Sequence, residues 1–137
     1  MGKQRVFLTG ATGAMGFLSL QELMKNPDEQ EVVILVRPSE KNKTMLAPFE
    51  GRAGLSVRWG DLKDYDDVYA CVENADLVLH VAAFVSPAAD YYPKEAMKVN
   101  FGSTRNIIHA IREQKREDDV RLVYIGTVAE TGDRMPP

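Results

Sequence analysis

The segment Thr9-Gly10-Ala11-Thr12-Gly13-Ala14-Met15-Gly16 decides the fold, because it separates a short apolar run from a longer helical pattern. Residues 5–9 have the length and composition of a strand that ends at glycine. Residues 14–25 have apolar side chains at helical spacing, at Met15, Leu18 and Leu23, until Asn26-Pro27 interrupts the pattern. A glycine-rich turn between a strand and a helix leaves backbone N–H groups at the positive end of the helix dipole. The segment therefore predicts a strand, an anion-binding turn and a helix.

Each glycine of this segment has a predicted role in holding a phosphate group. Gly10 permits the sharp turn, Gly13 lets a pyrophosphate approach the backbone, and Gly16 lets the helix pack close to the sheet. The alternative is that the glycines serve only a tight turn. No Gly-Lys-Ser/Thr follows, so nothing here indicates nucleoside triphosphate hydrolysis. The residues predicted to bind the ligand are Gly10, Thr12, Gly13, Ala14, Met15 and Gly16.

Short apolar runs and helical patterns alternate along the rest of the chain, which is typical of βαβ units. Residues 31–37 are apolar on both faces, as expected of a strand that helices cover on both sides. The sequence predicts an α/β fold of the Rossmann type, a doubly wound parallel sheet with strand order 3-2-1-4-5 and the ligand at the carboxyl ends of the first and fourth strands. Further strands are predicted at residues 55–59, 76–83 and 120–125, helices at residues 65–73 and 93–116, and a short helix with loops in residues 39–54.

Length and composition indicate one globular domain over residues 1–137. The chain is 45% hydrophobic and 27% charged, which is far from the composition of disordered proteins. Its net charge is −3 and it has no Lys/Arg block, so no nucleic acid partner is expected. A single cysteine favours a reducing compartment, and we expect a cytoplasmic protein. Threonine and glycine interrupt the first apolar run, so it predicts neither a signal peptide nor a membrane anchor.

The residue that follows the second strand bears on the choice of dinucleotide. About 20 residues after the glycine segment, an acidic side chain would hold the hydroxyl groups of an adenosine ribose. The residue at this place is Arg37, whose guanidinium can pair with a 2′-phosphate and stack on adenine. We therefore expect NADP as the cofactor, with NAD as the second choice. The alternative is a solvated arginine at a strand end.

Further short motifs follow the glycine segment in order. Together with it they resemble the cofactor-binding portion of the extended short-chain dehydrogenase/reductase superfamily, also described as the NAD-dependent epimerase/dehydratase family. This group contains nucleotide-sugar epimerases and dehydratases and the dihydroflavonol-reductase-like enzymes. The resemblance covers essentially the whole chain. The motifs are Gly60-Asp61-Leu62, His80-Val81-Ala82-Ala83, Val99-Asn100 and Tyr124-Ile125-Gly126-Thr127.

The resemblance implies cofactor contacts at the ends of the third and fourth strands. Asp61 and Leu62 are expected to contact the adenine, since the carboxylate can accept a hydrogen bond from the exocyclic amine. The alternative for Asp61 is a cap on the following helix. The small residues Ala82 and Ala83, with Val81 before them, are expected to lie close to the ribose and nicotinamide of the cofactor.

Two residues are implied to lie at the reaction site. Asn100 is expected to brace its floor, with an exposed asparagine as the alternative. Thr127 aligns with the Ser/Thr of the family's Ser/Thr-Tyr-Lys triad and is the predicted catalytic residue, with a hydroxyl that caps a turn as the alternative. His80 lies within an apolar strand and is expected to be a core residue, and no metal site is predicted.

The Tyr-x-x-x-Lys part of the triad does not occur in this sequence, since none of its five tyrosines is followed four residues later by lysine. The chain ends at Met135-Pro136-Pro137, which resembles the loop before the Tyr-Lys helix. We therefore expect a fragment that stops before that helix and the substrate domain. The resemblance also implies that a homodimer could form through the helix of residues 93–116.

Two functions stay open at this point. In the first, the protein is part of an NADP-dependent oxidoreductase, epimerase or dehydratase that transfers hydride to or from a carbonyl or carbinol substrate, such as a nucleotide sugar, aldehyde or ketone. Phe84 and Val85 would give its site an apolar wall, and Gly126 stands where many sugar-modifying members have serine. In the second, the chain is a non-catalytic module that binds or senses NADP. A scaffold without a ligand is a remote third.

Overall fold

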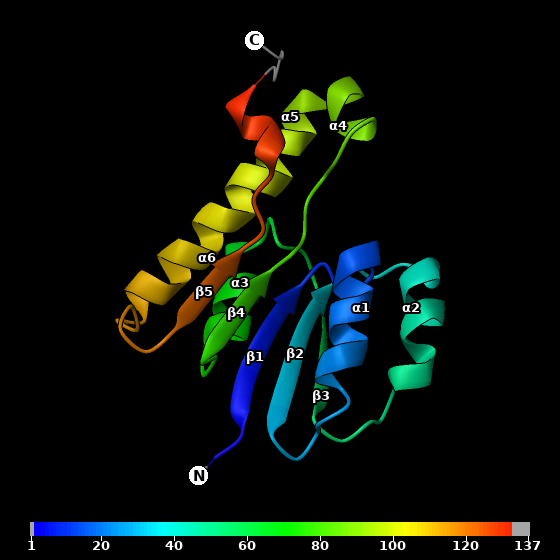
Figure 1. The fold of residues 1–137 in the computed structure, drawn as a ribbon, viewed down its shortest axis with the longest axis vertical. Coiled ribbons are helices and arrows are strands. Elements are labelled where there is room, and N and C mark those ends of the chain that lie inside the picture. The colour runs from blue at the N-terminus through cyan, green and yellow to red at the C-terminus, as the bar shows by residue number, and fades with distance from the viewer. Residues whose placement is uncertain (1, 133–137) are drawn as a thin grey trace.

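Five parallel strands form the central sheet of the protein (Figure 1). In the computed structural model, which describes residues 2–132, the strands are β1 (Gln4–Thr9), β2 (Gln30–Val36), β3 (Leu55–Trp59), β4 (Leu77–His80) and β5 (Arg121–Tyr124). Their order is β3-β2-β1-β4-β5, which confirms the predicted doubly wound sheet. The order reverses at β1, which pairs with β2 on one side and β4 on the other. Sheets of this kind bind ligands at the carboxyl ends of these central strands.

Helices cover both faces of the sheet (Figure 1). One face packs against α1 (Ala14–Leu23) and α2 (Glu40–Leu46), and the other against α3 (Tyr65–Val72) and α6 (Gly102–Glu113). Neighbouring residues of β1 point to opposite sides, so Phe7 packs with α3 and α6 while Leu8 packs with α1 and α2. Both side chains are fully buried. A strand that is apolar at every position is therefore stable here, because both its faces are covered.

The face of the first helix that packs against the core contains only part of its apolar residues. Gly16 and Leu20 are buried, whereas Met15 and Leu18 are 60% and 67% exposed. Phe17 packs edge-on against a phenylalanine after α2, in the short turn Ala47–Phe49. The predicted helix is confirmed, and of its three spaced apolar residues Leu23 packs against the core while Met15 and Leu18 lie on the exposed side. The close approach at Gly16 fixes the rotation of the helix.

The fourth strand is shorter than the predicted residues 76–83. β4 ends at His80, because the next two N–H groups, of Val81 and Ala82, each donate to Thr9 Oγ1 at 3.0 Å and leave the ladder. The chain then runs through a loop to the short helix α4 (Ala88–Tyr91).

The predicted helix over residues 93–116 is built from three consecutive parts. α5 (Pro93–Ala96) leads into a π-helical segment, Met97–Phe101, which continues into α6. Such π segments are rare and occur frequently at functional sites. None of the helices within residues 2–132 has the length and apolar character that a membrane crossing needs.

Candidate functional site

The turn between β1 and α1 lies against the residues that follow β4. Gly10 has a φ of 73°, in the left-handed region that favours glycine. A Cβ atom at this position would lie 2.8 Å from the N and Cα atoms of Ala82, so any side chain would push the two segments apart. The turn closes through a hydrogen bond from Gly13 N to Gly10 O at 2.9 Å. The predicted sharp turn at Gly10 is confirmed.

Gly16 is required by the close approach of α1 to this turn. A Cβ atom at Gly16 would overlap the carbonyl oxygen of Gly10, so α1 begins directly against the backbone of the turn. The predicted close packing of the helix at Gly16 is thus made against the turn that directly follows β1. Gly13 differs from both, because a Cβ there would approach only Gly10 O, at 3.3 Å, and the residue is exposed. The outer side of Gly13 is thus open to a ligand.

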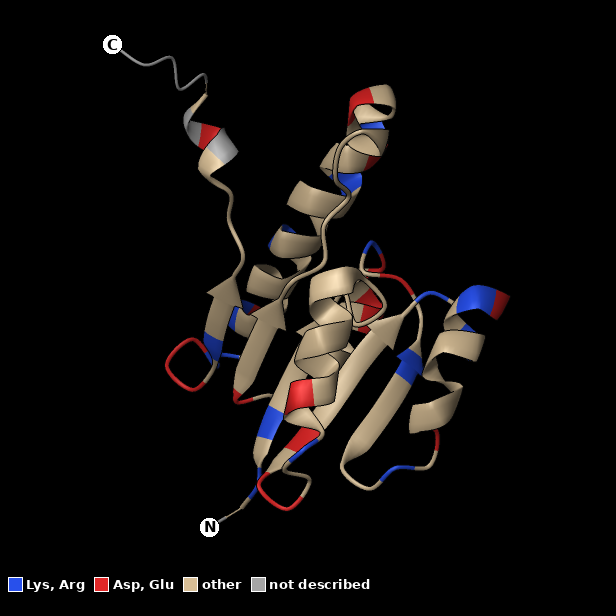
Figure 2. Cartoon of the chain, turned by 45° about the vertical axis from the view of Figure 1, so that its right-hand side comes forward, with Lys and Arg blue, Asp and Glu red and all other residues tan. Residues whose placement is uncertain are grey.

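The first turn of α1 has backbone donors without acceptors. Gly13 provides no side-chain cap to α1, whereas side chains cap α2 and α3. Within residues 2–132, the N–H groups of Ala14 and Met15 form no hydrogen bond, and both residues are exposed. In Figure 2 this turn is coloured tan, because it has no Lys, Arg, Asp or Glu residue. Unpaired N–H groups at the positive end of a helix dipole suit a phosphate.

Arg37 follows β2 at the same edge of the sheet. Its main-chain oxygen accepts a hydrogen bond from Asn42 Nδ2 at 2.9 Å, which holds the backbone in place. Its side chain is exposed and makes no hydrogen bond or ion pair to another residue in the described part of the chain. The guanidinium is therefore free to pair with an anionic ligand.

The loop after β3 holds Asp61 and Leu62 in fixed positions. Asp61 Oδ1 accepts a hydrogen bond from Lys63 N at 2.8 Å and closes a turn. The cap of α3 is Asp64, so the alternative that Asp61 caps this helix is wrong. Leu62 packs against the core beside α3 and α6, and its main-chain oxygen accepts from Asn106 Nδ2 at 3.0 Å.

An ion pair that the sequence did not indicate joins this loop to α5. Lys63 Nζ lies 2.6 Å from Glu95 Oε1 and 3.9 Å from Asp61 Oδ2. The hydrogen bond to Glu95 raises the pKa of Lys63 and lowers the pKa of Glu95 in return. Lys63 and Glu95 lie 32 positions apart, and no spacing rule connects them.

His80 is buried at the end of β4 and is bonded at both ring nitrogens. Nδ1 lies 2.8 Å from Thr9 Oγ1, and Nε2 lies 2.9 Å from Thr104 Oγ1. Burial lowers the pKa of His80 to about 4, so the imidazole is neutral. The prediction that His80 is a core residue is confirmed. Among the residues that the structure describes, no three His, Cys, Asp or Glu side chains gather where they could hold a metal ion.

Asn100, in the π-helical segment, clamps the loop after β4. Its Oδ1 accepts from Phe84 N at 2.7 Å, and its Nδ2 donates to Phe84 O at 2.9 Å. The alternative of an exposed asparagine is therefore wrong. Phe84 is half-buried, while Val85 beyond it is 66% exposed.

Thr127 lies beyond the end of β5 and is exposed. Its main-chain oxygen accepts a hydrogen bond from Glu130 N at 3.4 Å, at the turn Val128–Thr131. The catalytic role of Thr127 stays a prediction. Met135-Pro136-Pro137, the expected loop before a Tyr-Lys helix, lies outside the described residues.

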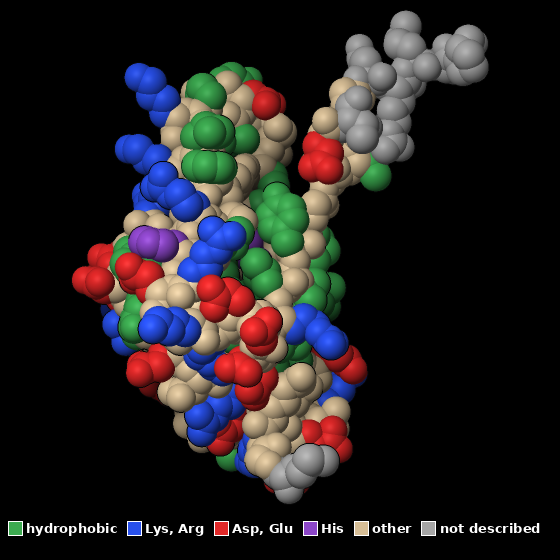
Figure 3. Space-filling model, turned by 90° about the vertical axis from the view of Figure 1, so that its left-hand side faces the viewer, with side chains coloured by type: hydrophobic (Ala, Val, Ile, Leu, Met, Phe, Trp, Pro, Cys, Tyr) green, Lys and Arg blue, Asp and Glu red, His purple; other side chains and the backbone are tan. Residues whose placement is uncertain are grey.

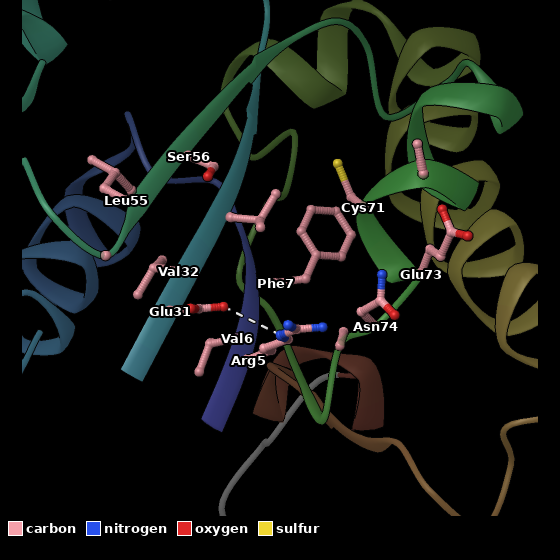
Figure 4. A pocket seen from close by; sticks show the side chains of 14 residues that line it. Arg5, Val6, Phe7, Glu31, Val32, Leu55, Ser56, Cys71, Glu73 and Asn74 are labelled. Atoms are coloured by element: carbon pink, nitrogen blue, oxygen red, sulfur yellow. Dashed lines mark hydrogen bonds and ion pairs between the residues drawn. The ribbon is translucent and has the colours of Figure 1, made fainter. Parts of the chain in front are cut away.

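The structure thus brings the predicted residues to one edge of the sheet. The glycine turn, Arg37, Asp61 and the segment 81–83 each follow the carboxyl end of a strand. A hollow of about 490 Å³ lies at the opposite, amino-terminal edge (Figure 4). Its rim includes Arg5 and Glu31, whose side chains pair at 3.2 Å, and it contains none of the predicted residues.

Comparison with known proteins yields a family and a consistent set of relatives. Residues 6–137 match the model of the NAD dependent epimerase/dehydratase family. UDP-N-acetylglucosamine 4,6-dehydratase (inverting) of Campylobacter jejuni is 30% identical over 112 residues, which is 81% of this chain and 33% of that protein. UDP-glucose 4-epimerase of Rickettsia bellii is 28% identical over 109 residues, 77% of this chain and 32% of that protein. The chain therefore spans about a third of the length of these relatives.

A solved structure shares the fold over almost the whole chain. The Bordetella bronchiseptica enzyme WbmH, in complex with NAD+, superposes with a TM-score of 0.74 at 22% identity. The match covers 96% of this chain and 41% of WbmH.

Proposed function

Because the chain belongs to the NAD dependent epimerase/dehydratase family, we propose that it is the cofactor-binding part of an enzyme that transfers hydride to or from a carbonyl or carbinol carbon of its substrate. The observation that carries this proposal is the turn between β1 and α1. Its glycines leave no room for side chains at Gly10 and Gly16, and its exposed N–H groups lack acceptors. A purely structural turn has no need of unpaired donors.

The residues present fit a nicotinamide dinucleotide. The N–H groups of Ala14 and Met15, with Thr12 beside them, would hold the pyrophosphate, as the glycine cradle leaves space for it. Within residues 2–132, Asp61 Oδ2 has an ion pair with Lys63 at 3.9 Å but no hydrogen bond, and it would accept one from the adenine amine. The segment 81–83 would lie beside the ribose and nicotinamide, where small side chains allow close approach. When bound, the nicotinamide supplies the hydride acceptor or donor.

We assign NADP as the preferred dinucleotide and NAD as the second. The support is Arg37, an unpaired guanidinium at the end of β2 where a ribose-binding carboxylate would favour NAD. The comparisons support a nicotinamide dinucleotide in general, since one structural relative was solved with NAD+.

The experiment is a titration of the protein with NADPH and with NADH, followed by nicotinamide fluorescence. We expect saturable binding of one dinucleotide per chain, with NADPH the tighter of the two. Absence of binding of either dinucleotide would contradict the proposal.

The proposed substrate is a carbonyl or carbinol compound such as a nucleotide sugar, aldehyde or ketone. Support for a nucleotide sugar comes from the names of two relatives, a UDP-N-acetylglucosamine 4,6-dehydratase and a UDP-glucose 4-epimerase. Thr127 is the proposed triad hydroxyl, and Asn100 the group that braces the site floor through Phe84.

A second candidate function is a non-catalytic module that binds or senses NADP. It requires that the whole protein has no Tyr-x-x-x-Lys motif, and none occurs in these 137 residues, which span about a third of the length of the relatives. The intact mass of the protein from its native host separates the candidates. A mass well above that of 137 residues favours the enzyme, with a Tyr-x-x-x-Lys motif expected beyond Pro137, and an equal mass favours the module.

We also propose a homodimer through the helical segment that contains the π turn. Met97, Phe101 and Ile108 are exposed along it by 61%, 57% and 38%. In Figure 3, hydrophobic side chains gather at the top of the molecule and beside the segment that follows β5. Light scattering should give twice the mass of one chain, and Phe101→Glu should reduce it to a single chain.

A further inference from the structure

A buried chain of hydrogen bonds joins the glycine turn to the π-helical segment through His80. The first link joins Thr9 Oγ1 to His80 Nδ1 at 2.8 Å, and the second joins His80 Nε2 to Thr104 Oγ1 at 2.9 Å. The third link runs from Thr104 Oγ1 to the main-chain oxygen of Asn100 at 2.8 Å. Asn100 in turn holds the N–H and the C=O of Phe84. One continuous set of bonds thus connects the proposed cofactor loop with the floor of the proposed reaction site.

The Thr9 end of this chain fixes which ring nitrogen of His80 has a proton. A hydroxyl group has one hydrogen to donate and two lone pairs that can accept. Both lone pairs of Thr9 Oγ1 are taken, by the N–H groups of Val81 and Ala82. The hydrogen of Thr9 is therefore left for His80, and Nδ1 must be an acceptor without a proton.

The Thr104 end requires the same tautomer independently. Thr104 Oγ1 donates its hydrogen to Asn100 O, so toward the imidazole it acts as an acceptor. His80 Nε2 therefore has the proton. Ser103 Oγ lies 3.4 Å from the same nitrogen and is a second, weaker acceptor.

Among the described residues, no charged side chain forms a hydrogen bond or an ion pair with the ring of His80. β1 and α6 face it with the hydroxyl groups described above, and β5 faces it with Tyr124, whose ring centroid is 6.0 Å away. A proton added at Nδ1 would set two donors against each other at Thr9. Burial, which lowers the pKa of His80 to about 4, acts in the same direction.

We propose that His80 is a positioning residue, fixed as the neutral Nε2–H tautomer, which links the placement of Val81 and Ala82 to that of Asn100. The identity of the ligand rests on the proposed function, whereas the tautomer follows from the protein's own hydrogen bonds. In this role His80 keeps the cofactor contacts and the site floor in one arrangement.

The tautomer is tested by long-range proton–nitrogen correlation NMR of the ¹⁵N-labelled protein without ligand. The sequence has two histidines, and the variant His109→Gln assigns the signals of His80. We expect a single set of signals with the proton on Nε2, unchanged between about pH 7 and about pH 5.5. A proton on Nδ1, or signals averaged over both tautomers, would overturn the proposal.

The link to ligand binding is tested with Thr104→Val, which keeps the shape of the side chain and removes its hydrogen bonds. We expect NADPH to bind about five- to tenfold more weakly, the effect of one buried hydrogen bond. Thr104→Ser should restore wild-type affinity. Thr44→Val, which removes the same kind of hydroxyl bond to the main-chain oxygen four residues earlier but on the exposed helix α2, should leave affinity unchanged.

Wild-type affinity in a folded Thr104→Val variant would overturn the link between His80 and the cofactor contacts. If the wild-type protein bound no dinucleotide, the proposed function would fail instead. The NMR experiment uses neither a ligand nor the Thr104→Val variant. It would therefore decide the tautomer of His80 even if no dinucleotide bound or the variant did not fold.

Discussion

Arg37 and Lys63 are both cations at the carboxyl edge of the sheet, but only Lys63 forms an ion pair in the part of the chain that the structure describes. Lys63 lies 2.6 Å from Glu95, whereas Arg37 has no ion pair within residues 2–132. Because the charge of Lys63 is offset, Arg37 is the group with capacity for a 2′-phosphate. The sequence identified Arg37 from its distance to the glycine turn. It could not identify the pairing of Lys63 with Glu95, which depends on the packing of α5.

Reversing the charge at Arg37 should change the preference between the two dinucleotides. We expect Arg37→Asp to weaken NADPH binding at least about tenfold and NADH binding by less than about threefold, since only NADPH has a 2′-phosphate. Fluorescence titration measures both affinities. Arg112→Asp, at the end of α6, makes the same change in net charge and is the control. Equal losses for NADPH and NADH in Arg37→Asp would refute the assignment.

At the scale of elements, the loop from β3 to α3 contains one aspartate that stabilises a helix and another that is proposed to bind the ligand. Asp64 caps α3 by accepting from Asp66 N at 2.9 Å and from Asp67 N at 3.4 Å. Asp61, three residues earlier, closes a turn through one oxygen and leaves the other without a hydrogen bond in the described residues. The two carboxylates therefore have different proposed tasks, although they lie in the same loop.

We expect Asp64→Ala to lower the free energy of unfolding by about 1 kcal/mol, the usual cost of losing a helix cap, without changing dinucleotide affinity. Asp61→Ala should weaken dinucleotide binding about fivefold or more through the lost adenine contact. Urea unfolding and fluorescence titration of both variants measure the two effects. If Asp61→Ala bound dinucleotide as tightly as the wild type, the adenine role of Asp61 would be wrong.

Element types were predictable from the sequence, whereas several details of their packing were not. The apolar runs and the glycine turn predicted five strands and their order. The end of β4 was missed because Thr9, more than 70 positions earlier, captures the N–H groups of Val81 and Ala82. The buried face of α1 could not be read from the spacing of its apolar residues. The rotation of the helix depends on the contact between Gly16 and Gly10, and the spacing carries no information about this contact.

At the scale of the whole molecule, the site is assembled from the ends of separate strands around two core clusters. One cluster lies on each face of the sheet, and β1 contributes Phe7 to one and Leu8 to the other. The motifs were sufficient to predict which residues meet at this edge. The hydrogen-bonded chain through His80 was not predictable, because Thr104 has no motif that connects it to the glycine turn.

Burial of His80 should make the stability of the whole fold depend on pH. The pKa of His80 is about 4 in the folded protein, below its ordinary value of 6.5, so the unfolded chain binds the proton first as the pH falls. Stability is therefore complete above about pH 6.5 and is lost toward about pH 4. We expect the free energy of unfolding to fall by about 2 kcal/mol between about pH 7 and about pH 5.

Urea unfolding at several pH values measures this dependence. The control is His80→Asn, which retains an acceptor toward Thr9 but cannot titrate. Its stability should be lower at neutral pH and flatter across this range. Identical slopes for the variant and the wild type would show that His80 is not the group responsible.

The most direct test of the central claim is the affinity of NADPH for the wild-type protein and for Gly13→Ala. Gly13 has a φ of −83° and a ψ of 170°, which alanine can adopt, and a Cβ there meets only Gly10 O, at 3.3 Å, so that a small shift of this oxygen accommodates it. We expect the variant to unfold at nearly the wild-type temperature and to bind NADPH about tenfold or more weakly, because the methyl group occupies the side that a pyrophosphate would approach. Gly102→Ala, where a Cβ has room, is the control and should bind normally. Equal NADPH affinity in Gly13→Ala and the wild type, or no binding by the wild type, would contradict the assignment of this turn as the dinucleotide site.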